Sequence, residues 1–582
     1  MKSLWRLKPY FARYKWKLIM GLIIVTLSNL LTVVNPFFAR KALDSLIGGT
    51  ATASSLLLLG GGIVLFTFLS GFFMFLTRET IIVVSREIEN DMRNDFLGHI
   101  ETLSLQFFHD MPTGDIMAYS TNDIAAVRNF IGPCIMYSAD TITTFVFIIS
   151  IMFYLNVKVT LFSLLPLPFV SYGVYLIGKR VYPLFTKVQE QFATITTRAQ
   201  ESISGMRVVR AYVRESYEEA QFKLLSWEYY LKNMRLIKVQ GMMQPLMFML
   251  IGASQIILLV VGAGEIIGHH MTIGGLTQFM MYLSLLIWPM IAFGWVANMV
   301  QRAAASMQRL NDVMDMKTGI ADNGQTDAKI SSLQGEVSYN NVRFHYPGRT
   351  QQTLDDISIA IPRGATVGII GTTGSGKTTL TNLLPRLYEP ESGEVLIDGR
   401  SVQHIPLGVL RRDISVVTQE PFLFSDTIRN NIAFGKFDAT EEQVHHAAQI
   451  AQIHEDITGF PMKYETMVGE RGITLSGGQK QRTAIARAII CEPKILILDD
   501  ALSAVDTNTE DAILTGLRKF MRERTSIMIA HRISTVKNAD LIIVMDEGKI
   551  IERGTHEELL TLGGMYADIN EKQLLEEELE QL

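Results

Sequence analysis

The sequence predicts a multi-domain protein in which an all-α transmembrane domain is followed by an α/β domain. A chain of 582 residues is long enough for several domains. Hydrophobic residues make up 48% of it, which is high for a soluble protein, and the excess lies in the first 300 residues or so. Strand-like runs that alternate with helical segments begin only after a polar stretch near residue 330.

Six apolar stretches are long enough to cross a bilayer, which takes about 20 helical residues. Little more than "NVK" separates the third from the fourth, so these two are predicted to form a hairpin. The polar connections at about 80–130 and 179–240 show helical periodicity, and we expect long helices that extend beyond the membrane. The stretches are 18–39, 56–76, 135–155, 159–177, 245–267 and 273–296.

The distribution of basic residues predicts the orientation of these spans. The first 17 residues carry six Lys or Arg and no acid, and the 179–240 connection carries eleven. Because cytosolic loops are enriched in Lys and Arg, both termini and both long connections are expected in the cytosol, with the spans in the cell (inner) membrane. Two widely separated cysteines, Cys134 and Cys491, exclude a disulfide framework. A net charge of −5 gives no reason to expect nucleic acid as a partner.

Composition also divides the chain into expected domains. Residues 1–320 form the transmembrane domain, and the polar stretch 321–334 is a linker. Residues 335–570 contain buried-strand patterns such as "ATVGII", "ILILD" and "SIMIA", and form the α/β domain. The acidic end, 571–582, is expected to be a solvated helix or tail.

A glycine-rich loop follows the "ATVGII" strand and opens a helical segment. The run "GTTGSGKT", Gly371 to Thr378, fits G-x-x-x-x-G-K-[ST]. Glycines let backbone N–H groups close around phosphates, Lys377 reaches the β- and γ-oxygens, and Thr378 can hold Mg²⁺. A chance glycine-rich turn would not be expected to have a strand before it and a helix after it. The sequence therefore predicts a P-loop site for ATP and Mg²⁺, formed by Gly371, Thr372, Thr373, Gly374, Ser375, Gly376, Lys377, Thr378 and Thr379.

Further downstream, the buried strand "ILILDD" ends in Asp499 and Asp500. A hydrophobic run that ends in aspartate is a weak signal by itself, but it is strong as the partner of a phosphate loop. Asp499 is expected to hold Mg²⁺ through water, as the second anionic element of P-loop enzymes does.

The run "LSGGQKQR", Leu475 to Arg482, lies just upstream of that strand, and with it nearly the whole chain resembles an ABC transporter half of the exporter type. The resemblance implies that Ser476, Gly477, Gly478 and Gln479 close on the γ-phosphate held by the opposite subunit. It also implies that Tyr346 stacks on adenine, that Gln419 senses Mg²⁺ and the membrane domain, and that His531 is a switch histidine at the γ-phosphate. A lone Tyr, Gln or His is more often structural, so these assignments depend on their order along one α/β pattern.

Four more segments match the same family. "GERG", 469–472, resembles the exporter-specific loop at the domain contact, and "SAVD", 503–506, resembles the loop that crosses the dimer. The segments 107–123 and 201–215 resemble the two coupling regions, which in the family dock on nucleotide-binding domains. Without the resemblance, these last two would be interpreted as polar helix ends.

Asp500 departs from the family pattern, in which a glutamate polarises the attacking water. Aspartate is one methylene shorter, whereas a general base must come within about 2.6–3.2 Å of its proton. A displacement of about 1 Å can cost on the order of a hundredfold in rate. The site is therefore expected to bind ATP and hydrolyse it slowly. A second, different half-transporter is the favoured partner, because its own phosphate loop and glutamate would complete one good site; a homodimer is the alternative.

The substrate is expected to be a hydrophobic or cationic small molecule, with membrane lipids around it. Asp140 is a carboxylate inside the third span, either a contact for cations or a residue at the wet cytosolic edge. A lipid flippase and an importer of exporter topology remain alternatives, whereas the six spans argue against a soluble ABC ATPase, and no inserted segment suggests a regulated channel. Met and aromatic side chains, which suit promiscuous ligands but also helix packing, gather in the last two spans: Met242, Met243, Met247, Phe248, Met249, Met280, Met281, Tyr282, Trp288, Met290, Phe293 and Trp295.

Overall fold

The computed structural model describes residues 2–348, 351–469, 475–503 and 507–581. It divides into two compact units. The first unit contains Met1–Ile100 and Gly114–Asp315, and the second contains Glu101–Thr113 and Met316–Leu582. The short segment Glu101–Thr113, which lies within the predicted transmembrane domain 1–320, groups with the second unit.

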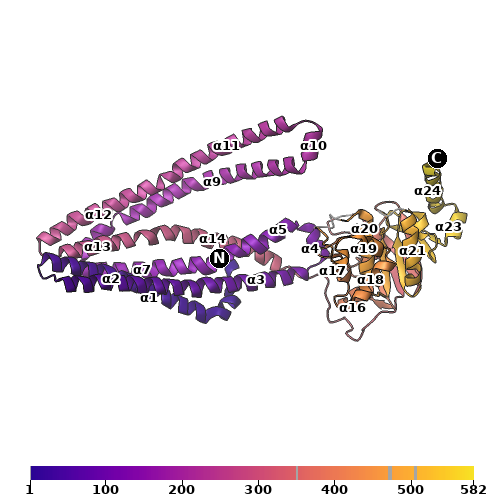
Figure 1. Ribbon diagram of the computed structural model, residues 1–582, viewed down its shortest axis with the longest axis horizontal. Coiled ribbons are helices and arrows are strands. Elements are labelled where there is room, and N and C mark those ends of the chain that lie inside the picture. Colours follow the sequence, from indigo (N-terminus) through magenta and orange to yellow (C-terminus); the bar gives the residue numbers. More distant parts are fainter. Residues whose placement is uncertain (1, 349–350, 470–474, 504–506, 582) are drawn as a thin grey trace. The chain divides into compact units, whose positions relative to one another are not determined.

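The first unit is built from long helices (Figure 1). Three of its connections are π-helical turns within otherwise continuous helices: η2 (Arg78–Ile82), η3 (Tyr119–Asp123) and η4 (Phe130–Cys134). The other elements are η1 (Lys2–Leu7), α1 (Lys8–Ile47), α2 (Ala53–Thr77), α3 (Val83–Glu101), α5 (Thr113–Ala118), α6 (Ile124–Asn129), α7 (Ile135–Leu155), α8 (Val157–Leu164), α9 (Leu167–Ser204), α10 (Met206–Ala211), α11 (Glu215–Gly241), α12 (Met243–Ile267), α13 (Ile273–Leu285) and α14 (Ile287–Met314).

Within the described part of the chain, five helices are long and apolar enough to cross a membrane. They are Lys2–Ile47, Ala53–Glu101, Thr113–Leu155, Glu215–Ile267 and Ile273–Met314. The predicted fourth span, 159–177, is not among them, because its helix is interrupted between α8 and α9 at Leu165 and Pro166. The sixth crossing therefore stays a prediction.

The predicted hairpin at "NVK" is present as the turn between α7 and α8. Asn156 is the only residue between these helices, and its side chain accepts a hydrogen bond from Val159 N–H as the N-cap of α8. Asn156 Nδ2 and Lys158 Nζ both donate to the Glu265 carboxylate, at 3.1 and 2.9 Å. The turn is thereby joined to the end of α12.

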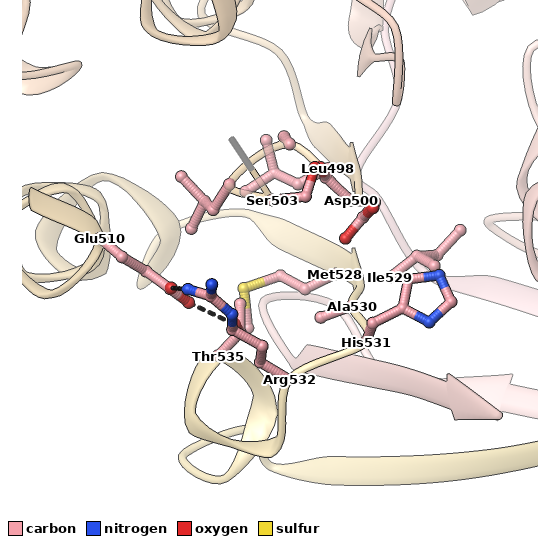
Figure 2. Close-up of a pocket in the computed structure, with 12 residues that line it drawn as sticks. Leu498, Asp500, Ser503, Glu510, Met528, Ile529, Ala530, His531, Arg532 and Thr535 are labelled. Atoms are coloured by element: carbon pink, nitrogen blue, oxygen red, sulfur yellow. Dashed lines mark hydrogen bonds and ion pairs between the residues drawn. The ribbon is translucent and has the colours of Figure 1, made fainter. Parts of the chain in front are cut away.

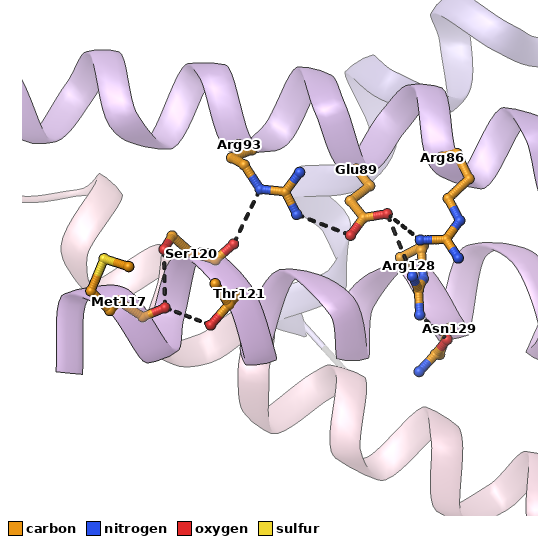
Figure 3. Close-up of polar contacts among 8 residues, drawn as sticks. All are labelled: Arg86, Glu89, Arg93, Met117, Ser120, Thr121, Arg128 and Asn129. Atoms are coloured by element: carbon orange, nitrogen blue, oxygen red, sulfur yellow. Dashed lines mark hydrogen bonds and ion pairs between the residues drawn. The ribbon is translucent and has the colours of Figure 1, made fainter. Parts of the chain in front are cut away.

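A buried carboxylate joins α3 to α6 on the polar extension of the first unit (Figure 3). Glu89 on α3 is 8% exposed, and its oxygens accept from Arg86 and Arg93 at 3.0 Å. Arg128 on α6 forms an ion pair with the same carboxylate at 3.6 Å. Since three guanidinium groups share one carboxylate, this contact holds together two helices that are separated in the chain by residues 102–123.

The described residues of the second unit form two sheets. The six-stranded sheet has the order β10-β9-β3-β8-β7-β6, in which every neighbouring pair is parallel except β10 with β9. Its strands are β3 (Thr366–Gly371), β6 (Ile414–Val417), β7 (Ile495–Asp499), β8 (Thr525–Ile529), β9 (Leu541–Asp546) and β10 (Lys549–Gly554). The smaller antiparallel sheet has the order β2-β1-β4-β5 and consists of β1 (Val337–Phe344), β2 (Leu354–Ile361), β4 (Ser392–Ile397) and β5 (Arg400–Ser401).

Every residue of β7 and β8 is buried, as expected for parallel strands covered on both faces. The carboxyl ends of β3, β7 and β8 lie at one edge, where ligands bind in open α/β sheets. The helical elements of this unit are α4 (Leu105–Asp110), α15 (Lys377–Asn382), η5 (Val402–His404), α16 (Leu407–Asp413), α17 (Ile428–Ala433), α18 (Glu441–Ile450), α19 (His454–Gly459), η6 (Lys463–Glu465), α20 (Gly477–Ile489), α21 (Thr507–Met521), α22 (Ile533–Val536), α23 (His556–Leu562) and α24 (Met565–Gln581).

The end of the expected linker is fixed to the second unit. Leu333 is buried, and its N–H donates to the Asp413 carboxylate at 2.8 Å. Asp398 accepts from the N–H groups of Gln334 and Gly335 at 2.7 and 3.0 Å. Residues 333–335 are therefore packed structure, in contrast to a free tether.

Candidate functional site

The glycine-rich loop joins the end of β3 at Gly371 to the start of α15 at Lys377. Gly374 and Gly376 have φ angles of +85° and +96°, which side chains with a Cβ rarely adopt. A Cβ at Gly376 would lie 2.6 Å from the carbonyl oxygen of Thr353. The backbone therefore requires glycine at residue 376 for both conformation and space.

Lys377 lies inside this loop and is only 7% exposed. Its Nζ donates to the carbonyl oxygens of Gly371 and Thr372, at 3.0 and 2.7 Å. Burial lowers the pKa of the ammonium, and the charges of Asp499 and Asp500 act in the opposite direction. The loop thus holds a cation against the sheet edge where the two aspartates lie.

A cleft of about 310 Å³ opens over the loop. It contains most of the residues that the sequence predicted for the ATP site: Tyr346, Thr373, Gly374, Gly376, Lys377, Thr378, Thr379, Gln419, Asp499, Asp500 and His531. Gly371, Thr372 and Ser375 belong to the loop but do not line the cleft. Sequence reasoning missed Gln351, Gln352 and Thr353, which precede β2 and line the same cleft. No motif marks these three residues, and only the pairing of β2 with β1 brings them near the loop.

The two aspartates at the end of β7 have different surroundings. Asp499 is 5% exposed, and burial raises the pKa of its carboxyl group, an effect that a hydrogen bond from Thr378 opposes. Asp500 has a φ angle of +48°, and its N–H donates to the Ile529 carbonyl at 2.9 Å. Gln419, which follows β6, donates through Nε2 to Asp500 Oδ2 at 3.3 Å. The structure therefore directly links two of the predicted catalytic side chains.

Tyr346 lies at one side of the cleft within an aromatic cluster. Its ring meets those of Phe344 and Tyr388 edge to face, with centroids 5.1 and 5.3 Å apart. Its hydroxyl is 2.9 Å from Thr379 Oγ1. These contacts fix the ring beside the first turn of α15.

The predicted signature residues do not join this cleft. Ser476 is the N-cap of α20, where its hydroxyl accepts from Gln479 N–H at 3.3 Å and Gln479 Oε1 accepts from Ser476 N–H at 3.0 Å. Gln479 Nε2 also donates to Asp456 at 2.9 Å. Ser476 and Gly477 are exposed and Gly478 is partly exposed, so this helix start is open to another surface. Residues 470–472 of "GERG" and 504–506 of "SAVD" lie outside the described residues.

A second cavity, of about 130 Å³, adjoins the carboxyl ends of β7 and β8 (Figure 2). His531 and Asp500 line it together with Glu510 of α21. Glu510 is 2% exposed, and it accepts from Arg532 at 2.8 Å and from Thr535 at 2.5 Å. The loop that carries His531 is therefore joined to α21.

Residues 107–113 of the first predicted coupling segment belong to the second unit, and residues 114–123 belong to the first. Residues 101–105 and Phe108 line a cleft of about 570 Å³ that also contains Leu387, Leu407 and Arg411. The second predicted segment contains α10, where Val208 and the following Tyr212 and Val213 are exposed.

Asp140, the carboxylate of the third predicted span, is on α7. Asn29 of α1 donates to its carbonyl oxygen at 3.2 Å and to Thr143 Oγ1 at 2.7 Å. One turn earlier on α7, the Tyr137 ring lies 6.4 Å from that of Trp288 and 5.4 Å from that of Trp295. Two aromatic residues of the last predicted span are thus neighbours of α7.

The cleft over the loop suits a nucleotide triphosphate with a divalent cation. Ser375 Oγ is buried and has no hydrogen-bond partner among the described residues, as expected for a group that awaits an anion. The Thr378 hydroxyl, the Asp499 carboxylate and the Gln419 amide are oxygen donors of the kind that Mg²⁺ prefers. The aromatic ring at one end, the loop and its lysine, and this donor set occupy one cleft.

Comparison with known proteins agrees with this arrangement. The family "ABC transporter transmembrane region" matches residues 18–290, and the family "ABC transporter" matches residues 354–503. The chain is 38% identical over 573 residues to "Probable multidrug resistance ABC transporter ATP-binding/permease protein YheI" of Bacillus subtilis, covering 98% of this chain and 97% of that protein. This chain is an ABC half-transporter of the exporter type.

Other relatives of this ABC half-transporter have different names. It is 33% identical over 582 residues to "Multidrug resistance-like ATP-binding protein MdlA" of Escherichia coli, covering 100% of this chain and 98% of that protein. It is 36% identical over 483 residues to an "ATP-dependent lipid A-core flippase" of Desulfotalea psychrophila, covering 83% and 84%. Among solved structures, a bacterial Atm1-family ABC exporter with ATP bound superposes with a TM-score of 0.82 at 29% identity, covering 96% of this chain and 99% of that one.

These matches confirm the predicted fold class, a helical transmembrane domain followed by an α/β nucleotide-binding domain. They also identify the half-transporter as a multi-pass membrane protein with an ATP-binding, ATP-hydrolysing domain.

Proposed function

We propose that this ABC half-transporter is one subunit of a heterodimeric exporter in the cell membrane, with both termini and the ATP-binding domain in the cytosol. It moves hydrophobic or amphipathic compounds out of the cytosol or the inner leaflet. Two relatives with multidrug-resistance names, each similar along almost the whole chain, support this substrate class. Asp140, together with the aromatic residues near α7, offers a contact for cationic substrates.

The cleft residues have separate roles in this proposal. Tyr346 stacks on adenine, the loop N–H groups and Lys377 hold the phosphates, and Thr378 and Asp499 hold Mg²⁺, with Gln419 as a further ligand. When bound, Mg²⁺ neutralises charge on the phosphate oxygens. His531 contacts the γ-phosphate. The grouping of these side chains in one cleft supports the assignment.

One observation carries the heterodimer, namely the residue after Asp499. Asp500 has the charge of a water-polarising glutamate but a shorter side chain, and Gln419 donates to its carboxylate at 3.3 Å. A base that is one methylene shorter and already accepts a hydrogen bond from Gln419 is poorly placed to accept a proton from water beside the γ-phosphate. The site of this chain therefore retains ATP and turns it over slowly.

The exposed signature completes the opposite site. Because Ser476 and Gly477 lie at an exposed helix start away from the cleft of their own chain, they are available to the nucleotide of the partner half. The partner's phosphate loop and glutamate, together with this signature, would then form the site that drives transport.

Steady-state ATPase rates of the purified pair test this division of labour. Replacing the partner's glutamate with glutamine should remove nearly all turnover, and Asp500→Asn should cost much less, since its site already reacts slowly. A double change of Ser476 and Gly477 should again be severe, although both lie on the chain with the weak base.

Two results would contradict the heterodimer. One is an Asp500→Asn pair as inactive as the pair with the partner's mutant. The other is this chain, expressed alone, forming a dimer with full drug-stimulated turnover. Since some relatives are named lipid A-core flippases, transport of labelled dyes and labelled lipids in vesicles of known orientation separates drug export from lipid flipping.

A further inference from the structure

The last helix of the chain reaches the loop that carries His531. Gln573 of α24 accepts a hydrogen bond at Oε1 from Ile533 N–H, at 2.8 Å. Its Nε2 donates to the carbonyl oxygen of His531 at 2.7 Å. One side chain thus bonds the main chain on both sides of Arg532, immediately after β8.

The start of α24 is anchored independently of Gln573. The Glu552 carboxylate accepts from the N–H groups of Met565 and Tyr566, at 2.6 and 3.1 Å. Tyr566 is fully buried, and its hydroxyl is 2.8 Å from His556 Nδ1. The helix is therefore held against the sheet whether or not Gln573 makes its own bonds.

The two bonds satisfy groups that the loop cannot satisfy by itself. Arg532 is the N-cap residue of α22 but makes no side-chain capping bond, so Ile533 N–H is a first-turn donor without an intrahelical partner. Glu510 holds the side chains of Arg532 and Thr535 (Figure 2). Glu510 fixes side chains, and Gln573 fixes the main chain next to the histidine.

We propose that Gln573 is a positioning residue for His531, through which the C-terminal helix controls how long this chain's own site retains ATP. The inference rests on the proposed role of His531 at the γ-phosphate. Because Gln573 bonds the carbonyl of His531 itself, its loss leaves the imidazole free to move away from the nucleotide without undocking α24.

The test uses the assembled full-length transporter, with azido-ATP photolabelling of the separated chains to follow ATP release from this chain's site. Gln573→Leu removes both hydrogen bonds from the side chain to the main chain. It should shorten ATP retention about five- to tenfold, the order expected for the loss of such bonds. Gln573→Glu keeps the acceptor for Ile533 N–H but not the donor, and should fall between Leu and wild type. Lys572→Leu, an exposed neighbour on the same helix, is the matched control and should leave retention unchanged.

Two further measurements separate positioning from general stability. Amide exchange at Ile533 should accelerate roughly tenfold in Gln573→Leu while the amides of Met565 and Tyr566 remain protected. In a His531→Ala background, Gln573→Leu should have almost no additional effect on retention, because the two residues act on the same contact.

Two results would overturn the inference. The first is that Gln573→Leu shortens ATP retention equally in the wild-type and the His531→Ala backgrounds. The second is that Gln573→Leu leaves ATP retention unchanged although His531→Ala shortens it. The second result leaves the proposed function standing. Unchanged retention in His531→Ala alone would instead remove the proposed role of His531, and the inference with it.

Discussion

Gly376 shows how a single residue determines the geometry of the phosphate loop. Its φ angle of +96° places it in the left-handed region, and the Thr353 carbonyl occupies the space that a side chain would need. Gly399, in the turn between β4 and β5, has a similar φ angle of +72° but nothing within 4 Å of a Cβ position. A comparison of Gly376 with Gly399 therefore separates the effect of backbone strain from that of steric collision.

We therefore predict that Gly376→Ala abolishes azido-ATP labelling of this chain and lowers its thermal stability. The change combines left-handed strain of about 1–2 kcal/mol with overpacking of about 1–3 kcal/mol. Gly399→Ala should cost about 1 kcal/mol and retain labelling. Equal losses in the two variants would mean that strain alone accounts for the glycine at residue 376.

Among the described residues, three helices of the α/β domain, α18, α20 and α23, begin with a capping box. Ser476 and Gln479 exchange hydrogen bonds at the start of α20, and Thr440 and Gln443 do so at the start of α18. A capping box stabilises any helix by satisfying its first N–H groups. Only the α20 start belongs to the proposed composite site.

At this scale we predict that Ser476→Ala and Thr440→Ala each destabilise the domain by about 1 kcal/mol. Turnover of the purified pair should fall at least tenfold in Ser476→Ala alone, because that hydroxyl faces the partner's nucleotide in the proposed assembly. Thermal unfolding and ATPase rates of both variants check this. A Ser476→Ala transporter with the turnover of Thr440→Ala would reduce Ser476 to a helix cap.

For the whole molecule, the number of membrane crossings depends on one interrupted segment. Five helices meet the length and hydropathy expected of a span, and the stretch 159–177 is divided between α8 and α9. If that stretch crosses, α9 continues into the cytosol. If the stretch 159–177 does not cross the membrane, α9 lies on the extracellular side.

Single cysteines in a background lacking Cys134 and Cys491 decide between these topologies. Thr50→Cys in the turn before α2 and His270→Cys in the turn before α13 should react with an impermeant maleimide from outside, whereas Ala193→Cys on α9 should react only from inside. Labelling of Ala193→Cys from outside would remove the fourth crossing. Labelling of Thr50→Cys from inside would reverse the orientation.

The sequence by itself determined the division into an apolar helical part and an α/β part, and it located the phosphate loop, the strand that ends in Asp499 and the signature. These features are local: a hydrophobic period, a glycine spacing or a cap is complete within a short run of residues. The shortened base at Asp500 was equally visible, because it is a single substitution in such a run.

Only the tertiary structure placed Gln351, Gln352 and Thr353 in the cleft, and only it grouped Glu101–Thr113 with the α/β unit. It also joined Gln573 to His531, 42 residues apart in the chain. Gln351, Gln352, Thr353 and Gln573 carry no motif, because each acts through a contact that exists only after strands pair and helices pack. Contacts between segments that are distant in sequence depend on the register of the sheet and the docking of α24, which no local pattern encodes.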